Sequence, residues 1–148
     1  MQSTVVDAGF LIGLFDEGDP LHRRCREFLR DYRGRFVTTE AVVTESLALL
    51  STAQQLRCLE WLGDASHTGL LDVDREPIDF RAVEKLTRKY ADQPMDFADA
   101  SLVLLATRSG IRDILTADRR DFSVYRVRGR IRFIDVLGDS DPGSTKRR

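Results

Sequence analysis

Three acidic residues that are far apart in the sequence stand beside expected strand ends or helix starts, namely Asp7, Asp99 and Asp118, and a fourth, Glu45, lies about two turns into an expected helix. Two carboxylates about 5 Å apart repel each other by roughly 3 kcal/mol at an effective dielectric constant near 20. Four together would cost on the order of 10 kcal/mol, as much as the whole stability of a typical domain, unless protons or a cation neutralise them. Oxygen ligands without a nearby His or Cys favour Mg²⁺ or Mn²⁺. Such an ion would serve phosphate-ester hydrolysis, because it polarises the phosphate and acidifies a bound water.

Two of these acids follow segments whose composition predicts buried strands. Asp7 comes directly after Ser3–Val6, and Asp118 follows Asp113–Thr116 with one residue between. In a parallel sheet, ligands bind beyond the carboxyl ends of the strands, so both acids are expected at one rim. Each of them alone could equally be a turn residue after a strand. Their meeting in space is what would indicate a function.

The other two acids belong to predicted helices that start at the same rim. Asp99 lies in the first turn of Phe97–Ser109, where it could also serve the helix dipole. Asp96 precedes it by three residues, so the two can share one face, and it has the type and position of an N-cap. Glu45 lies about two turns into Thr39–Leu50, which is otherwise largely apolar. A glutamate there faces either solvent or a polar cavity.

The elements that would position these acids alternate between strand and helix. Strands are expected at Ser3–Val6, Arg35–Thr38, Leu70–Val73, Asp113–Thr116 and, as a short fifth strand, Arg132–Ile134. Helices are expected at Leu21–Tyr32, Thr39–Leu50, Gln54–Asp64, Pro77–Tyr90 and Phe97–Ser109, the last stopped by Gly110. This order predicts an α/β fold of three layers, with helices on both faces of a mostly parallel sheet of four to five strands.

Length and composition are those of an ordinary globular domain. The chain has 148 residues, of which 42% are hydrophobic and 32% charged, with a net charge of −1. We expect one domain over residues 1–137 and a flexible tail over residues 138–148, which are rich in Gly, Ser, Asp, Pro and Arg. No apolar stretch predicts a membrane span or a secretory signal. Cys25 and Cys58 lack the partners of a zinc site, so reduced thiols of a cytoplasmic protein are expected.

At these acidic residues the sequence resembles the PIN-domain family, and most of all the VapC toxin ribonucleases of type II toxin–antitoxin pairs. The resemblance runs from Val5 to about Val136 and rests on four short segments in order: Val5–Ile12, Ala41–Leu50, Pro94–Val103 and Ile114–Phe122. The order and spacing of the four segments, together with the strand–helix pattern, make the resemblance specific.

The resemblance implies a PIN-like fold and metal-dependent cleavage of single-stranded RNA, leaving a 5′-phosphate and a 3′-hydroxyl. It implies that the metal, Mg²⁺ or Mn²⁺, is held by the acids Asp7, Glu45, Asp99 and Asp118. Asp96 matches an acid of this subgroup that supports the ligands, and Thr116 matches a hydroxyl position that supports the site. The family also implies a homodimer and an antitoxin that wraps a groove near the early helices and blocks the metal site.

Several arginines near Asp118 are candidates for binding the phosphates of RNA. Arg119 and Arg120 follow it directly, and a second group alternates with other residues: Arg126, Arg128, Arg130 and Arg132. On one strand the second group would share a face. A solvated face, or pairing with surface acids, explains the same pattern.

Other functions are compatible with parts of the sequence. An aspartyl phosphotransferase would use Asp7 as nucleophile but would want a second Asp at position 9, which is Gly, and a lysine at the rim. A metal-free ribonuclease would use His22 and His67, which are otherwise exposed bystanders. Within the resembled family, an RNA-processing nuclease that is not a toxin, or a catalytically silent module that binds RNA or protein, would carry similar motifs. The aromatic residues Phe28, Tyr32, Phe36 and Trp61 are expected in the core or an interface rather than in a base-stacking platform.

Overall fold

The structure of the chain is a computed structural model that describes residues 1–93 and 95–138. Its centre is a five-stranded sheet in which every pairing is parallel. The strands lie in the order β3 (Leu71–Asp74), β2 (Arg35–Thr39), β1 (Ser3–Val6), β4 (Asp113–Leu115), β7 (Ile134–Asp135). The expected parallel α/β architecture is thus confirmed, and β1 lies in the middle of the sheet.

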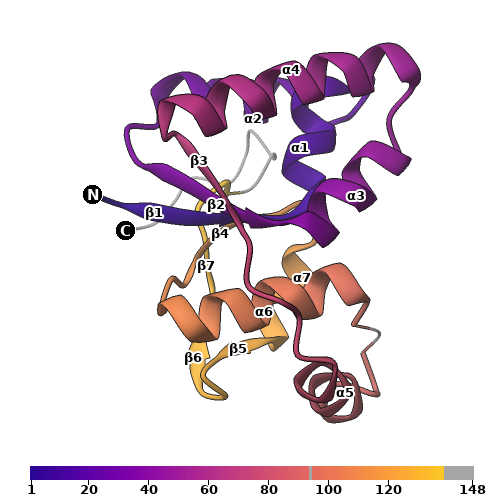
Figure 1. Cartoon of the computed structure of the whole chain (residues 1–148), viewed down its shortest axis with the longest axis vertical. Helices are drawn as coiled ribbons and strands as arrows, with labels where there is room; N and C mark the ends of the chain where they lie inside the picture. Colours follow the sequence, from indigo (N-terminus) through magenta and orange to yellow (C-terminus); the bar gives the residue numbers. More distant parts are fainter. Residues whose placement is uncertain (94, 139–148) are drawn as a thin grey trace.

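Helices cover both faces of this sheet (Figure 1). One layer contains α1 (Ala8–Phe15), α2 (His22–Asp31) and α4 (Thr52–Thr68), and the other contains α5 (Phe80–Lys89), α6 (Phe97–Ser109) and α7 (Arg119–Val124). The remaining helix, α3 (Glu40–Ala48), starts where β2 ends and packs against both α1 and α6. It therefore connects the two layers beyond the carboxyl ends of the strands.

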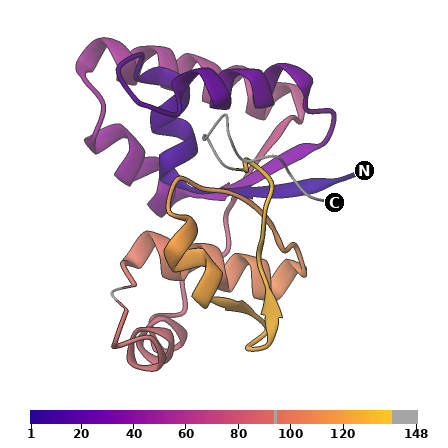
Figure 2. The same cartoon turned by 180° about the vertical axis from the view of Figure 1, so that it is seen from behind.

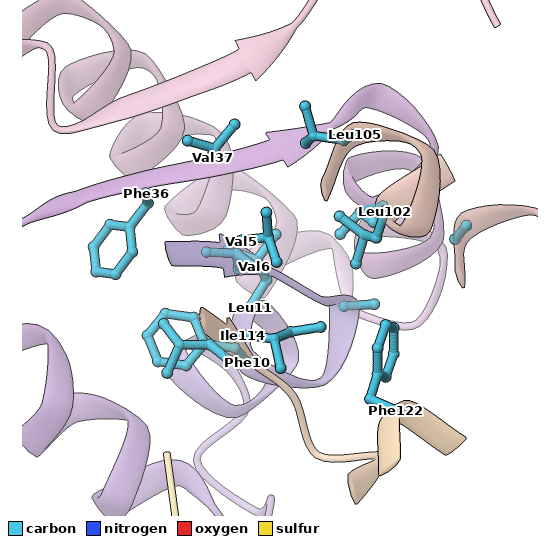
Figure 3. Close-up of a cluster of buried hydrophobic side chains, with 14 of the residues drawn as sticks. Val5, Val6, Phe10, Leu11, Phe36, Val37, Leu102, Leu105, Ile114 and Phe122 are labelled. Carbon is cyan, nitrogen blue, oxygen red and sulfur yellow. The ribbon is translucent and has the colours of Figure 1, made fainter. Parts of the chain in front are cut away.

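The strands form because their residues are buried on both sides. Val5, Val6 and Ile114 are fully buried, as are Phe10 of α1 and Leu102 of α6, which approach the sheet from opposite faces (Figures 1 and 3). Burial of one such side chain contributes about 1.5–3 kcal/mol. Short β-branched runs between two helical layers therefore become central parallel strands.

The expected aromatic core is also present. Rings of Phe28, Tyr32, Phe36 and Trp61 pack in sequence, with centroids 5.1 Å, 4.7 Å and 6.2 Å apart. Both cysteines are buried and free, as predicted. In the residues described, no helix is long and apolar enough to cross a membrane.

Two helices of the structure, α1 and α7, were not predicted from the sequence. Segment Ala8–Phe15 is apolar on most sides, so it lacks the periodic polar face that identifies a surface helix. Segment Arg119–Val124 is too short to show a period. A third helix, α4, is longer than predicted, because the Ser51–Gln54 capping box starts it early and Gly69, at φ 82°, ends it late.

The C-terminal region departs most from the prediction (Figure 2). The expected fifth strand at Arg132–Ile134 is replaced in the sheet by β7, which begins at Ile134. The arginines expected on one strand instead form a hairpin of β5 (Arg126–Val127) and β6 (Ile131–Arg132). The chain reverses at residues 128–129, both of which have a positive φ. Of the predicted tail 138–148, all but Gly138 lies outside the described residues.

Candidate metal-dependent active site

The predicted acids meet in one hollow at the carboxyl end of the sheet. A cavity of about 290 Å³ is lined by the five carboxylates of Asp7, Glu45, Asp96, Asp99 and Asp118. We call this cavity the acidic pocket. Its other lining residues are apolar or glycine, so no Lys or Arg among the residues described here lines it. The expectation that these acids share one rim is confirmed, and their chemical roles are considered below.

Asp7 is fixed by the junction between β1 and α1. Its backbone N–H still donates to Leu115 of β4 at 2.9 Å, and its Oδ1 accepts from the N–H of Ala8 as the helix cap. Its Oδ2 accepts from the hydroxyl of Thr116 at 2.8 Å. Burial raises the pKa of Asp7 above its ordinary 3.8, although these hydrogen bonds act in the opposite direction.

Thr116 joins the two strand ends that carry acids. Its buried hydroxyl donates to Asp7 and accepts from the backbone N–H of Asp118 at 2.8 Å. Close packing supports this link, because a Cβ added to Gly9 would lie 2.5 Å from the Cβ of Ala117. Its hydroxyl therefore lies between Asp7 and the backbone of Asp118.

Asp96 and Asp99 are positioned by the start of α6. Asp96 is the N-cap, as predicted, and accepts from the N–H of Asp99 at 2.8 Å. Asp99 is buried, and its Oδ2 accepts from the hydroxyl of Tyr125 at 3.3 Å. Burial, and next the charge of Asp7, raise the pKa of Asp99 to about 8.

Glu45 reaches the pocket from α3. The cap residue Thr39 starts this helix, and its hydroxyl bonds Ser101 of α6 at 2.7 Å, so the two helices are held in register. The pKa of Glu45 is raised to about 7, first by burial and then by the negative charges of Asp96 and Asp7. Its carboxyl group also shares a hydrogen bond with that of Asp96. Of the two orientations that the sequence left open, Glu45 faces the polar cavity.

Asp118 lies at the start of α7 beside an acid that sequence reasoning did not single out. Asp118 caps the helix through the N–H of Asp121 at 3.4 Å, and the two carboxyl groups share a hydrogen bond. Partial burial of its carboxyl group raises the pKa of Asp118 to about 6. The pKa of Asp121 is lowered, first by that bond to Asp118 and then by Gln93, whose amide donates to it.

Sequence reasoning also missed Tyr125, which is fully buried against Asp99. Burial raises the pKa of this tyrosine well above its usual range, so its hydroxyl stays a hydrogen-bond donor. The only sequence signal for Asp121 is its spacing of three residues from the cap Asp118. Tyr125 has no such signal, because its contact spans 26 residues of sequence.

The oxygen ligands of the acidic pocket suit a hard divalent cation, but the carboxylates do not enclose one. All of the pocket's ionisable lining groups are carboxylates, and four of them have a raised pKa, first because burial disfavours the charged form and then because other acids lie nearby. Among the residues described, no group of three or more His, Cys, Asp or Glu is close enough to enclose a metal ion. Mg²⁺ keeps several waters and binds through one or two carboxylates, so an open set of acids suits it better than a closed cage.

The arginines predicted to bind RNA have different surroundings. Arg119 forms an ion pair with Asp135 of β7. The guanidinium of Arg126 donates to three backbone carbonyls between residues 123 and 125, and that of Arg128 donates to the carbonyl of Thr107. Arg120 is exposed at the start of α7. The single arginine face expected over residues 126–132 is wrong, because the hairpin interrupts it.

The histidines lie away from the acids. His22 is half-buried rather than exposed, and its Nδ1 bonds the carbonyl of Gly13 at 2.7 Å. His67 is exposed in the last turn of α4. Neither lines the acidic pocket. This placement gives no support to a ribonuclease that uses the two as an acid–base pair.

Comparisons with known proteins agree with this geometry. The family model of the PIN domain matches residues 4–128. Ribonuclease VapC26 of Mycobacterium tuberculosis is 31% identical over 137 residues, which cover 87% of this chain and 96% of that protein. The crystal structure of VapC20 from Mycobacterium tuberculosis, described as a toxin that cleaves the sarcin-ricin loop, superimposes with a TM-score of 0.69. That match covers 82% of this chain and 95% of the other at 15% identity, so it supports the fold alone.

Proposed function

Since the chain belongs to the PIN-domain family, and within it resembles the VapC ribonucleases, we propose that it is an endoribonuclease whose reaction takes place in the acidic pocket. The observation that carries this proposal is that carboxylates from separate elements line one cavity, which no Lys or Arg among the described residues lines: Asp7, Glu45, Asp96, Asp99 and Asp118. Carboxylates gathered without a basic partner indicate a site that works with a cation.

The proposed cofactor is Mg²⁺, or Mn²⁺ in its place, and the residues that would hold it, directly or through its bound waters, are Asp7, Glu45, Asp99 and Asp118. When bound, the ion would polarise the scissile phosphate and lower the pKa of a water molecule. Asp96 positions the site by capping α6 and bonding Glu45, and Thr116 orients Asp7. Tyr125 donates to Asp99 Oδ2 and thereby fixes the rotation of that carboxylate. Arg120, which is exposed in α7, would contact a neighbouring phosphate, and Arg119, Arg126 and Arg128 stay as weaker candidates for the same role.

We further propose that the protein is the toxin of a type II toxin–antitoxin pair and acts in the cytoplasm. Its partners would then be single-stranded RNA, a cognate antitoxin that covers the acidic pocket and a second copy of the chain. The exposed apolar residues Leu49, Leu56 and Leu59 support the antitoxin proposal, because Leu49 lines the acidic pocket and the other two continue the apolar surface on the next helix, α4. We assign the nuclease domain to residues 1–137.

Cleavage of a labelled single-stranded RNA tests the proposal. The wild-type protein should cut in Mg²⁺ or Mn²⁺, lose activity in EDTA, and leave a 5′-phosphate. Asp99→Asn should reduce cleavage at least a hundredfold, whereas Asp64→Asn, an exposed acid on α4, serves as the matched control and should cut normally. If Asp99→Asn cleaves as well as wild type, the assignment of the site is wrong. Binding of RNA and antitoxin without any turnover would identify a silent module instead.

A further inference from the structure

Two exposed aromatic side chains at the starts of α5 and α6 pack against each other and have no place in the core. Phe80 is the first residue of α5 and is 73% exposed, and Phe97 is the first residue of α6 and is 45% exposed. Their ring centroids are 6.4 Å apart, and their planes differ by 30°. Leaving two phenylalanine rings in solvent loses several kcal/mol of favourable burial, so the pair is a candidate for binding a ligand.

The pair is continuous with the catalytic end of α6. Phe97 stands between Asp96, which lines the acidic pocket and caps α6, and Asp99, which lines it from the first turn. Phe97 directly follows Asp96, so its backbone adjoins a residue that lines the pocket, about 3.8 Å away between Cα atoms. The ring of Phe80 extends the aromatic surface outward from there onto α5, which packs outside α6 (Figure 1).

Cations continue the surface beyond the rings. Arg81 directly follows Phe80, and Lys85 lies one turn later on the same face of α5. Both side chains are exposed, and neither forms an ion pair with any residue that the structure describes. Aromatic rings flanked by cations are the surface that non-specific single-strand binding proteins offer, since the rings stack on bases and the cations meet the phosphates.

We propose that Phe80 and Phe97 form a nucleobase subsite, which stacks a base of single-stranded RNA next to the nucleotide being cut, while Arg81 and Lys85 bind the adjoining phosphates. The subsite rests on the proposed function, because it places the RNA relative to the acidic pocket. It also explains why the strand must be single: a base within a duplex has both faces already stacked. The subsite would hold the flanking nucleotide and leave the scissile phosphate over the carboxylates.

RNA oligonucleotides carrying one 2-aminopurine, moved position by position, test the subsite in EDTA, where no cleavage occurs. Wild-type protein should quench the fluorescence strongly at one position. Phe80→Leu and Phe97→Leu, which keep an apolar side chain but remove the ring, should lose that quenching and bind about five- to a hundredfold more weakly. The control Ile134→Ala removes an exposed apolar side chain at the start of β7, beside the amino end of β4, and should behave as wild type. An abasic residue at the quenched position should weaken wild type and leave the two Leu variants unchanged.

Two results would overturn the subsite. One is wild-type quenching and affinity in both Leu variants. The other is a change in their oligomeric state by light scattering with RNA affinity unaltered, which would assign the pair to contact between copies of the chain. The outcome is separate from that of the proposed function: normal cleavage by Asp99→Asn would refute the metal site and leave the subsite intact, whereas wild-type RNA binding by the Leu variants would do the reverse.

Discussion

The protonation of Asp99 gives the sharpest quantitative test of the acidic pocket. In the folded protein without metal its pKa is about 8, against 3.8 ordinarily, so the folded chain keeps a proton that the unfolded chain has lost between these pH values. The stability of the metal-free protein therefore falls as pH rises through this window. At 1.36 kcal/mol per pKa unit, the difference between pH 7 and the ordinary pKa of 3.8 corresponds to a loss of about 4 kcal/mol of stability. At pH 5 the same calculation gives a loss of roughly 1–2 kcal/mol.

Asp99→Asn should remove this cost, because the amide is uncharged at every pH and its oxygen still accepts from Tyr125. For a chain of this size 1 kcal/mol moves Tm by about 3 °C, so in EDTA the variant should melt roughly 10 °C above wild type at pH 7 and roughly 4 °C above it at pH 5. Thermal unfolding followed by circular dichroism at pH 5, 6 and 7 measures this. Asp64→Asn on α4 should show no gain. A lower Tm for Asp99→Asn at pH 7, or a gain that does not shrink toward pH 5, would refute the reasoning.

Three further predictions follow from the same contacts. Saturating Mn²⁺, at about a hundred times its Kd, should raise the wild-type Tm by roughly 8 °C and that of Asp99→Asn by much less, as read in the same unfolding assay. Thr116→Val keeps the shape but removes the buried hydroxyl, so unfolding in urea should show a loss of about 1–3 kcal/mol, and RNA cleavage should fall at least tenfold. Gly9→Ala should displace the loop at Ala117 and cut activity, while Gly63→Ala, where a Cβ meets nothing within 4 Å, should leave activity unchanged and stabilise α4 by up to about 1 kcal/mol.

The site could be predicted from the sequence because strand ends and helix starts fix where an acid lies. Asp7 ends a β-branched run, and Asp96 and Asp99 open an apolar helix, so topology alone puts them at one rim. Glu45 was predictable only in part: an acid in an otherwise largely apolar helix could face solvent or a polar cavity, and the packed fold decides for the cavity. In each of these cases a local pattern determined a place in the fold.

The parts that sequence reasoning missed depend on tertiary contacts or lack a period. Helix α1 is buried on most sides and shows no polar stripe, and the hairpin at residues 126–132 forms where alternation predicted one strand. Its reversal requires a positive φ at Arg128, a conformation unusual for arginine, supported by bonds from its backbone N–H and guanidinium to Thr107. Tyr125 reaches Asp99 only once α6 and α7 are packed. These contacts follow from the assembled fold rather than from neighbouring residues.

Comparing magnitudes explains why the acidic pocket needs an external cation. Asp7 and Asp96 cap helices α1 and α6, whose dipoles favour negative charge by about 0.3–1 kcal/mol each, or about 0.6–2 kcal/mol together. Mutual repulsion of four carboxylates is on the order of 10 kcal/mol, so the helix termini offset only a small part of it. No basic side chain of the described residues lines the pocket to supply the rest. The remainder must come from protons, which the raised pKa values record, or from a divalent ion that replaces them near neutral pH. Metal binding and proton release are therefore one equilibrium here, and metal affinity should rise with pH across the range in which Glu45 and Asp99 lose their protons.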